Sequence, residues 1–328
     1  MFSATELQPV WYGDRQPPLH LRAIAALYGV VVGLRSAAYS SGLLRRTRLP
    51  VPVVVIGNIN AGGTGKTPLA LAVIEALRAR GYRPGVISRG HGGSARVPMR
   101  VDAGSDPAVA GDEPCLIARA SGAPVAIGRS RVAAARLLLD EDAADVLIAD
   151  DGLQHYALGR DVEICVIDGV RRFGNGRLLP AGPLREPAAR AAACTFRVCN
   201  GATPVADEIA MQLEGADAFS LDETLPARRL TEFAGQRVHA VAGIGNPARF
   251  FSQLRAAGID IVEHAFDDHH AFAPADIAFG DGLPVLMTEK DAVKCAEFAG
   301  PRQWFVPVVA RLPEQFFDAL AARLRRNG

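Results

Sequence analysis

The chain has 328 residues, which is long enough for two domains or for one large α/β domain with additions. Its 36 lysines and arginines nearly balance its 35 aspartates and glutamates, so no global field selects nucleic acid as a partner. The five cysteines are odd in number and form no CxxC pair, which argues against a disulfide framework or zinc ribbon and favours buried thiols in a reducing compartment.

The first patterned segment, residues 19–50, is apolar between Arg22 and Arg35 and carries arginines at both ends. The residues before it lack the basic stretch leading into an apolar one that is typical of a signal peptide. The apolar interval is too short to cross a bilayer as a helix. An apolar helix with cationic ends and aromatic neighbours is typical of one lying in the membrane interface. Burial of its apolar face against the core or in an oligomer is the alternative.

Residues 51–81 combine an apolar strand, a glycine-rich loop and a helical pattern, VPVVVIGNINAGGTGKTPLALAVIEALRARG. This order is typical of a P-loop, whose backbone N–H groups surround phosphate oxygens at the positive end of a helix dipole. Lys66 is expected to reach the β- and γ-phosphates, and the Thr67 hydroxyl to bind Mg²⁺. The predicted nucleotide-binding residues are Asn60, Ala61, Gly62, Gly63, Thr64, Gly65, Lys66 and Thr67.

Asn60 stands where the general P-loop pattern has a glycine. Asn tolerates left-handed backbone angles better than most residues, so a left-handed turn at Asn60 is expected to preserve the loop. A chance glycine-rich turn is the alternative, but the loop, Lys66, Thr67 and the flanking elements all agree with phosphate binding.

Strand-like and helix-like segments alternate after the P-loop. Strands are expected at 83–90, 123–128, 144–150 and 162–168, and helices at 115–122 and 129–140. A polar segment, 200–236, is a candidate linker or small crossing sheet, and a second alternating series begins near Arg237, with one strand expected at 304–309. We therefore predict an α/β fold with a largely parallel sheet of the P-loop NTPase type, a smaller C-terminal α/β domain and an N-terminal amphipathic helix. The expected boundaries are 1–48, 49–228 and 229–328.

Asp150 and Asp151 end a buried strand, ADVLIAD. A carboxylate at the carboxyl end of a strand beside a P-loop is in the Walker B position for Mg²⁺. An ordinary Asp-Asp-Gly turn is the alternative. The P-loop favours metal binding by at least one of the two.

Asp112 and Glu113 precede Pro114, which suits the first turn of a helix. Asp112 is therefore expected near a helix N-terminus. The ordinary role there is an N-cap, and the alternative is a general base for an acceptor hydroxyl.

Other polar residues follow predicted strands or lie in a long Gly/Pro-rich loop, residues 173–187. His155 either contacts a substrate or ends a turn, and Arg185 beside Glu186 suits a phosphate oxygen. In the run FDDHHAF, a hydrogen-bonded Asp–His pair is more plausible than a metal site, and a solvated loop is the alternative. Residues 288–291 are placed to read a nucleobase, although they are not an NKxD guanine motif.

Together these motifs resemble the tetraacyldisaccharide 4′-kinase family, the lipid A 4′-kinases of Gram-negative bacteria. The matching strings occur in the family's order: VIGNINAGGTGKTP, VISRGHGG, GDEP, DDGLQH, GNGRLLPAGPLREP, AGIGNP, DDHH and TEKDAVK. Many ATPases share GGTGKTP, whereas GNGRLLPAGPLREP with DDGLQH and TEKDAVK is much more specific.

The resemblance implies ATP- and Mg²⁺-dependent phosphorylation of the 4′-hydroxyl of a lipid A disaccharide 1-phosphate. It implies a peripheral enzyme on the cytoplasmic face of the bacterial inner membrane, with no nucleic acid and no obligate protein as partner. Asp112 matches the catalytic aspartate that accepts the hydroxyl proton, and His269 or its neighbour His270 matches the partner histidine. Lys66 and Thr67 match the P-loop pair, and Asp150 and Asp151 the metal-linked pair. The expected substrate-binding residues are Glu113, His155, Arg185 and Glu186.

Three other classes remain to be weighed. A membrane-associated P-loop ATPase of the partitioning or regulatory class typically has a lysine where this chain has Ala61. The apolar N-terminal helix disfavours a P-loop kinase for a soluble metabolite. A nucleotide-gated membrane scaffold leaves Asp112 and His269 unexplained.

Overall fold

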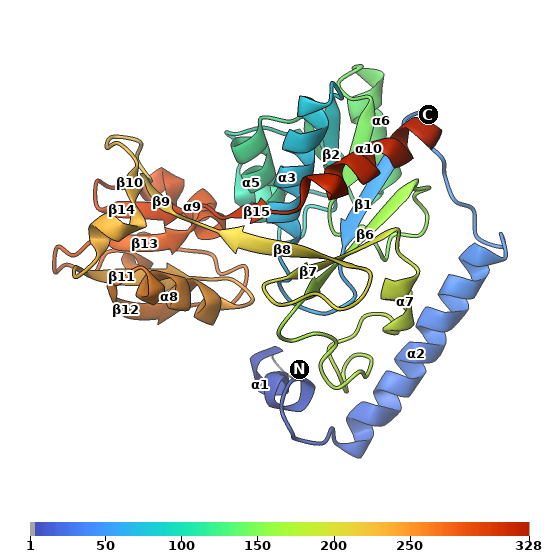
Figure 1. Ribbon diagram of the computed structural model, residues 1–328, viewed down its shortest axis with the longest axis horizontal. Coiled ribbons are helices and arrows are strands. Elements are labelled where there is room, and N and C mark those ends of the chain that lie inside the picture. Colours follow the sequence, from blue (N-terminus) through green and yellow to red (C-terminus); the bar gives the residue numbers. More distant parts are fainter. Residues whose placement is uncertain (1–3, 328) are drawn as a thin grey trace.

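The computed structural model describes residues 4–327, which form two β-sheets with helices packed around them (Figure 1). The larger sheet has the strand order β15-β8-β7-β6-β1-β5-β2-β4-β3. Its neighbouring strands are parallel, except β3 with β4 and β15 with β8 at the edges. The strands are β1 (Val53–Gly57), β2 (Pro84–Ser88), β3 (Met99–Val101), β4 (Val125–Ile127), β5 (Val146–Ala149), β6 (Val162–Asp168), β7 (Phe196–Asn200), β8 (Glu208–Glu214) and β15 (Val309–Arg311).

Helices cover both faces of the larger sheet, because its central strands are apolar on both sides. Strand β1, for example, is buried along its whole length. One face packs against α3 (Lys66–Ala79), α5 (Asp112–Ser121), which follows the short α4 (Pro107–Ala110), and α10 (Glu314–Asn327). The other face packs against α6 (Arg131–Asp140) and α7 (Ala189–Ala192). This arrangement confirms the predicted P-loop type of α/β fold.

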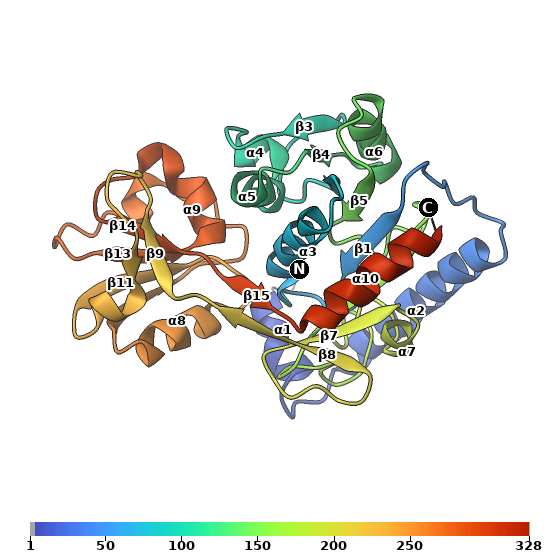
Figure 2. The same cartoon turned by 45° about the horizontal axis from the view of Figure 1, so that its top comes forward.

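The smaller sheet has the order β10-β9-β14-β13-β11-β12. Its strands are β9 (Asp217–Ser220), β10 (Arg228–Arg229), β11 (Arg237–Ala242), β12 (Asp260–Ala265), β13 (Val285–Thr288) and β14 (Gln303–Val306). Helix α8 (Pro247–Ala256) packs in one of its apolar clusters and α9 (Glu289–Cys295) in the other. Figure 2 shows α5 and α9 side by side where the two units meet, and residues of these two helices are in contact.

The chain passes from one sheet to the other at positions that differ from the expected domain boundaries. The polar segment 200–236 contributes β8 to the larger sheet and β9 and β10 to the smaller one. The single strand expected at 304–309 is divided at Pro307, which cannot donate to a strand ladder, so β14 and β15 lie in different sheets. Strand β15 and α10 then pack on the larger sheet. The expected domain 229–328 does not match this pairing, and we assign residues 217–306 to an inserted second unit.

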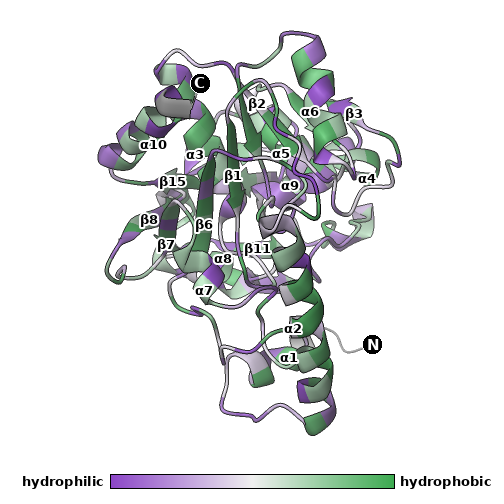
Figure 3. Cartoon of the chain, turned by 90° about the vertical axis from the view of Figure 1, so that its right-hand side faces the viewer, coloured by the Kyte–Doolittle hydropathy of each residue, from purple (hydrophilic) through white to green (hydrophobic). Residues whose placement is uncertain are grey.

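Helices α1 (Ala4–Trp11) and α2 (Leu19–Ser40) precede the first strand. Leu21 and Ala25 of α2 are buried against α1 and the 173–187 loop. Most of the other apolar side chains of α2 are exposed, namely Leu19, Ile24, Leu27, Val30, Val31 and Leu34, and Figure 3 shows this hydrophobic helix extending beyond the sheet. The 22-residue helix is long and apolar enough to cross a membrane by length and composition alone. The helix is longer than the apolar interval on which the expectation rested, because it continues beyond both Arg22 and Arg35.

Candidate active site

The P-loop connects β1 to α3 and lines a cavity of about 710 Å³ between the two units. Gly62 and Gly65 have φ values of 100° and 92°, which other residues rarely adopt. A Cβ on Gly65 would lie 2.5 Å from the side-chain nitrogen of Asn200, so both backbone angle and space require glycine there. Lys66 and Thr67 begin α3 and face the cavity.

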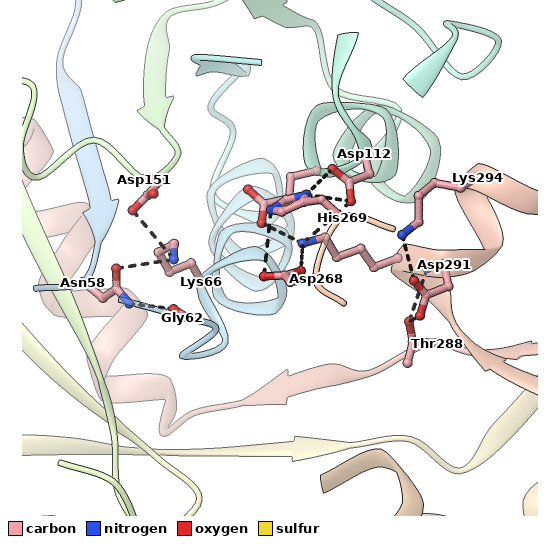
Figure 4. Close-up of polar contacts among 12 residues, drawn as sticks. Asn58, Gly62, Lys66, Asp112, Asp151, Asp268, His269, Thr288, Asp291 and Lys294 are labelled. Atoms are coloured by element: carbon pink, nitrogen blue, oxygen red, sulfur yellow. Dashed lines mark hydrogen bonds and ion pairs between the residues drawn. The ribbon is translucent and has the colours of Figure 1, made fainter. Parts of the chain in front are cut away.

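Lys66 lies between two oxygen acceptors (Figure 4). Its Nζ is 3.4 Å from Oδ1 of Asn58 and 3.7 Å from Oδ1 of Asp151. The Asn58 amide also donates a 3.2 Å hydrogen bond to the carbonyl of Gly62. Asn58 therefore holds both the loop and its lysine. Sequence reasoning missed this residue, although its place directly after β1 was a usable signal.

Asn60 is a structural residue of the loop. Its side-chain amide donates a 2.7 Å hydrogen bond to the carbonyl of Arg172, and its backbone pairs with Leu184. Among residues 4–327, the non-glycine residues with positive φ do not include Asn60. The expected left-handed turn at Asn60 was therefore wrong. The Asn60 amide is buried, and its hydrogen bond to the Arg172 carbonyl satisfies one of its polar groups.

The two aspartates after β5 differ in their surroundings. Asp150 is buried, and neither of its carboxylate oxygens has a hydrogen-bond partner within the described chain. Burial, reinforced by the charges of Glu113 and Asp151, raises the pKa of Asp150 to about 7. Burial also opposes ionisation of Asp151, but Lys66 and Arg185 outweigh it and lower the pKa of Asp151. Asp151 is thus a paired anion, whereas Asp150 is an unpartnered buried carboxyl.

Arg185 and Glu186 are neighbours in sequence but lie in different surroundings. Arg185 lines the cavity, with Nη1 3.2 Å from Oδ2 of Asp151. Glu186 is buried and accepts hydrogen bonds from Gln154 Nε2 at 2.8 Å and from the Tyr156 hydroxyl. Glu186 is not among the described residues that line the cavity. The structure therefore gives Glu186 a supporting role behind Gln154 and does not support its expected contact with substrate.

Asp112 and His269 come together from the two units (Figure 4). Asp112 is the first residue of α5, whose N-cap is Gly111, so the N-cap alternative for Asp112 was wrong. His269 Nδ1 lies 3.0 and 3.1 Å from the two carboxylate oxygens of Asp112. His270 instead contacts Asp276, at 3.1 Å. The histidine paired with Asp112 is therefore His269. Its backbone φ is 64°, in the left-handed region.

The charges of this pair follow from its contacts. Burial raises the pKa of Asp112, but the hydrogen bond from His269 and the charge of Lys290 outweigh it and lower that pKa to about 2. An ionised carboxylate only accepts hydrogen bonds, so His269 Nδ1 carries the proton in this contact. The same hydrogen bond raises the pKa of His269 above its usual value. His269 lines the cavity, whereas Asp112 lies behind it.

Lys290 belongs to this acidic cluster, and it lines the cavity with Thr288 and Glu289, so a nucleobase contact of this segment stays a prediction. The Nζ of Lys290 lies 3.1 Å from Asp268, 3.3 Å from Glu113 and 3.7 Å from Asp112. The neighbouring Asp291 is fully buried and accepts hydrogen bonds from Thr288 and the backbone of Gly243, so it supports the local fold. Glu113 lines the cavity as expected for a substrate-binding residue, but its nearest cation is Lys290.

Another part of the cavity wall carries His155 and several arginines. His155 lines it, and burial together with nearby arginines lowers the pKa of His155 to about 4. The contributing arginines that also line the cavity are Arg35, Arg89 and Arg131. Sequence reasoning missed all three as site residues, although Arg89 follows β2 directly and Arg131 begins α6, both common places for ligand-facing groups in α/β folds.

A P-loop lysine on one wall of a cavity and a carboxylate–imidazole pair on another are the arrangement of a P-loop phosphotransferase that activates an acceptor hydroxyl. Comparison with known proteins defines the class further. The family of tetraacyldisaccharide-1-P 4′-kinases, LpxK, matches residues 18–325. The chain therefore belongs to this family, as its motifs predicted, and the predicted enzyme class, a tetraacyldisaccharide 4′-kinase, is confirmed.

Similar proteins cover almost the whole chain. The tetraacyldisaccharide 4′-kinase of Stenotrophomonas maltophilia is 52% identical over 98% of this chain and 97% of its own length. That of Xanthomonas campestris pv. campestris is also 52% identical, over 96% of this chain and 94% of its own. A crystal structure of LpxK from Aquifex aeolicus in complex with ATP is 25% identical and has a TM-score of 0.77, covering 92% of this chain and 98% of that one. ATP is thus the nucleotide bound by a structural relative.

Proposed function

We propose that this kinase transfers the γ-phosphoryl group of ATP to the 4′-hydroxyl of a membrane-held lipid A disaccharide 1-phosphate, using Lys66 on the donor side and the Asp112–His269 pair on the acceptor side. The observation that carries the proposal is that Lys66 and His269 line the same cavity from different units. Phosphoryl transfer needs mostly positioning and charge stabilisation, and both groups are held by fixed partners.

On the donor side, Lys66 and the P-loop N–H groups would bind the β- and γ-phosphates of ATP. Lys66 pairs with Asp151 at 3.7 Å, a contact weak enough to be exchanged for phosphate oxygens. Arg185 supplies a second cation at the same wall and is suited to a phosphate oxygen.

The residues at the end of β5 fit Mg²⁺. Both oxygens of Asp150 and the hydroxyl of Thr64 are buried without hydrogen-bond partners among residues 4–327, and hard oxygen donors of this kind suit Mg²⁺. We assign Asp150 and Thr67 as the residues that would hold the ion, with Asp151 fixed nearby by Lys66 and Arg185. When bound, Mg²⁺ supplies neutralisation of charge on the transferring phosphoryl group.

On the acceptor side, the Asp112–His269 pair would take the proton of the sugar hydroxyl. A pKa of about 2 leaves Asp112 ionised, and the raised pKa of His269 makes Nε2 of its neutral imidazole a stronger base for the hydroxyl proton, while Nδ1–H stays bonded to Asp112. The two groups interact strongly and titrate as a unit, so the proton ends on the imidazole while Asp112 orients it. The charge of Lys290 helps to lower the pKa of Asp112, and its Nζ also lies 3.3 Å from Glu113.

We place the kinase on the cytoplasmic face of the inner membrane, and the exposed apolar side chains of α2 support its contact with a membrane. Leu27, Val31 and Leu34 are each more than half exposed, which is costly in water and favourable in lipid. Arg45, Arg46 and Arg48 follow the helix and are suited to anionic lipid headgroups. A substrate that carries acyl chains can then be presented to the cavity without leaving the bilayer.

The proposal is tested by incubating the purified protein with Mg-ATP and a lipid A disaccharide 1-phosphate in mixed micelles. We expect a 4′-phosphorylated product, and Asp112→Ala should lower kcat by about 10²–10⁴-fold while the Kd for ATP stays near that of the wild type. His269→Asn should also lower kcat strongly. His270→Asn is the matched control, because the imidazole of His270 contacts Asp276 and not Asp112. An Asp112→Ala enzyme with unchanged kcat would refute the base assignment.

A further inference from the structure

The 173–187 loop lies between the P-loop and the N-terminal helices. On its inner side, the N–H of Ala61 donates to the carbonyl of Pro183, and the N–H of Arg185 donates to the carbonyl of Ile59, both at 2.7 Å. These two bonds attach the loop directly to the residues that open the P-loop. A displacement of the loop would therefore move the nucleotide-binding backbone or break both bonds.

The outer side of the same loop is fixed by α1 and α2. Trp11 Nε1 donates a 3.0 Å hydrogen bond to the carbonyl of Pro180. Asn175 Nδ2 donates back to the carbonyl of Val10 at 3.0 Å. Gly29 of α2 lies so close to the loop that a Cβ there would be 3.0 Å from Leu178. The helix with the exposed apolar face is thus packed against the loop and not merely tethered to it.

Tyr28 contacts the backbone of Arg185, the arginine proposed to bind phosphate. Its hydroxyl donates a 3.0 Å hydrogen bond to the carbonyl of Arg185. The backbone of Arg185 is therefore held on one side by Ile59 of the P-loop strand connection and on the other by α2. Its side chain reaches Asp151, which also contacts Lys66. Two helical turns later, Arg35 donates to the carbonyl of Gln154 at 3.0 Å, in the loop that follows Asp151.

We propose that Tyr28 is a positioning residue, which makes the placement of Arg185 depend on the docking of α2 against the 173–187 loop. The inference rests on the proposed function, because it concerns the same cavity. It adds that α2, the helix proposed to face the lipid, also positions Arg185, the arginine proposed to bind phosphate. The kinase is then fully active only when α2 is seated as it is here, with Tyr28 and Arg35 bonded to the two loops on either side of Asp151.

The test removes only the hydroxyl. Tyr28→Phe keeps the ring and should lower kcat for the lipid acceptor by about two- to tenfold, the range for one neutral hydrogen bond, with KM for the acceptor little changed. Tyr39→Phe is the matched control, since Tyr39 lies on α2 and its ring packs against Tyr156 at 5.7 Å. Equal thermal unfolding midpoints for the three proteins would show that the fold is intact.

A double-mutant cycle separates positioning from a general effect on the fold. In an Arg185→Ala background, adding Tyr28→Phe should change kcat by less than about 1.5-fold, because the group that Tyr28 positions is gone. Equal losses in both backgrounds, or a Tyr28→Phe enzyme as active as the wild type, would overturn the inference. Absence of product from the wild-type protein would instead refute the proposed function, so the two failures are distinguishable.

Discussion

Asp150 provides a test of the proposed metal site that does not depend on activity. Its pKa of about 7 in the folded chain lies above the ordinary value of 3.8, so ionised Asp150 destabilises the metal-free fold. This destabilisation of the fold is absent below about pH 4, grows as the pH rises between the two pKa values and is complete above pH 7. At 1.36 kcal/mol per pKa unit it reaches about 4 kcal/mol at pH 8 and about 2 kcal/mol at pH 5.

Asp150→Asn removes this charge with little change of shape. In EDTA at pH 8, the variant should therefore be more stable than the wild type by up to about 4 kcal/mol, and at pH 5 by less than half of that. Urea unfolding followed by tryptophan fluorescence measures both values, because Trp11 and Trp304 are both buried. Added Mg-ATP should stabilise the wild type and not the variant.

The control is Asp140→Asn, which changes an exposed aspartate at the end of α6. It should alter the free energy of unfolding by less than about 0.5 kcal/mol at either pH. Two results would refute the reasoning: an Asp150→Asn variant no more stable than the wild type at pH 8, or a gain of the same size at pH 5 and pH 8. Either would mean that Asp150 is not an unpartnered buried acid.

Two further predictions concern the inserted unit and α2. Phe233 is fully buried and its ring meets Trp304 edge-on at 5.7 Å, so Phe233→Ala should lower the free energy of unfolding by about 3–5 kcal/mol, as measured by urea unfolding. Replacing Leu27, Val31 and Leu34 by Gln should lower partitioning into anionic vesicles by at least about tenfold in a flotation assay, with little change in folding. Val97→Gln with Val205→Gln, exposed valines elsewhere, should leave partitioning unchanged.

The P-loop and the parallel sheet could be predicted because their signals are local. A glycine-rich loop between an apolar strand and a helix carries its own geometry, and Gly62 and Gly65 adopt positive φ angles there. Asn60 was misread because its reason is not local: the carbonyl that its amide satisfies belongs to Arg172. The same holds for Glu186, whose acceptors face Gln154 and Tyr156 behind the cavity.

The division of the chain into units was also beyond local patterns. An apolar run such as residues 304–309 does not reveal that its two halves join different sheets, since strand pairing depends on the whole topology. Pro307 was the one available signal. The choice between His269 and His270 likewise required the folded backbone, in which His269 has a positive φ and bonds to Asp112.

The Asp112–His269 pair joins the two units, and this explains why its members are strongly bonded. Lys66 and Asp151 belong to the larger sheet and its helices, as does Asp112, but His269 comes from the inserted unit. Burying Asp112 without a partner would be costly, so the carboxylate favours the arrangement in which His269 and Lys290 of the second unit lie against it. The Asp112–His269 pair is therefore also a contact that holds the two units together around the cavity. In the proposed mechanism, the proton acceptor is complete only where the two units meet, which keeps the acceptor hydroxyl from being activated away from the bound nucleotide.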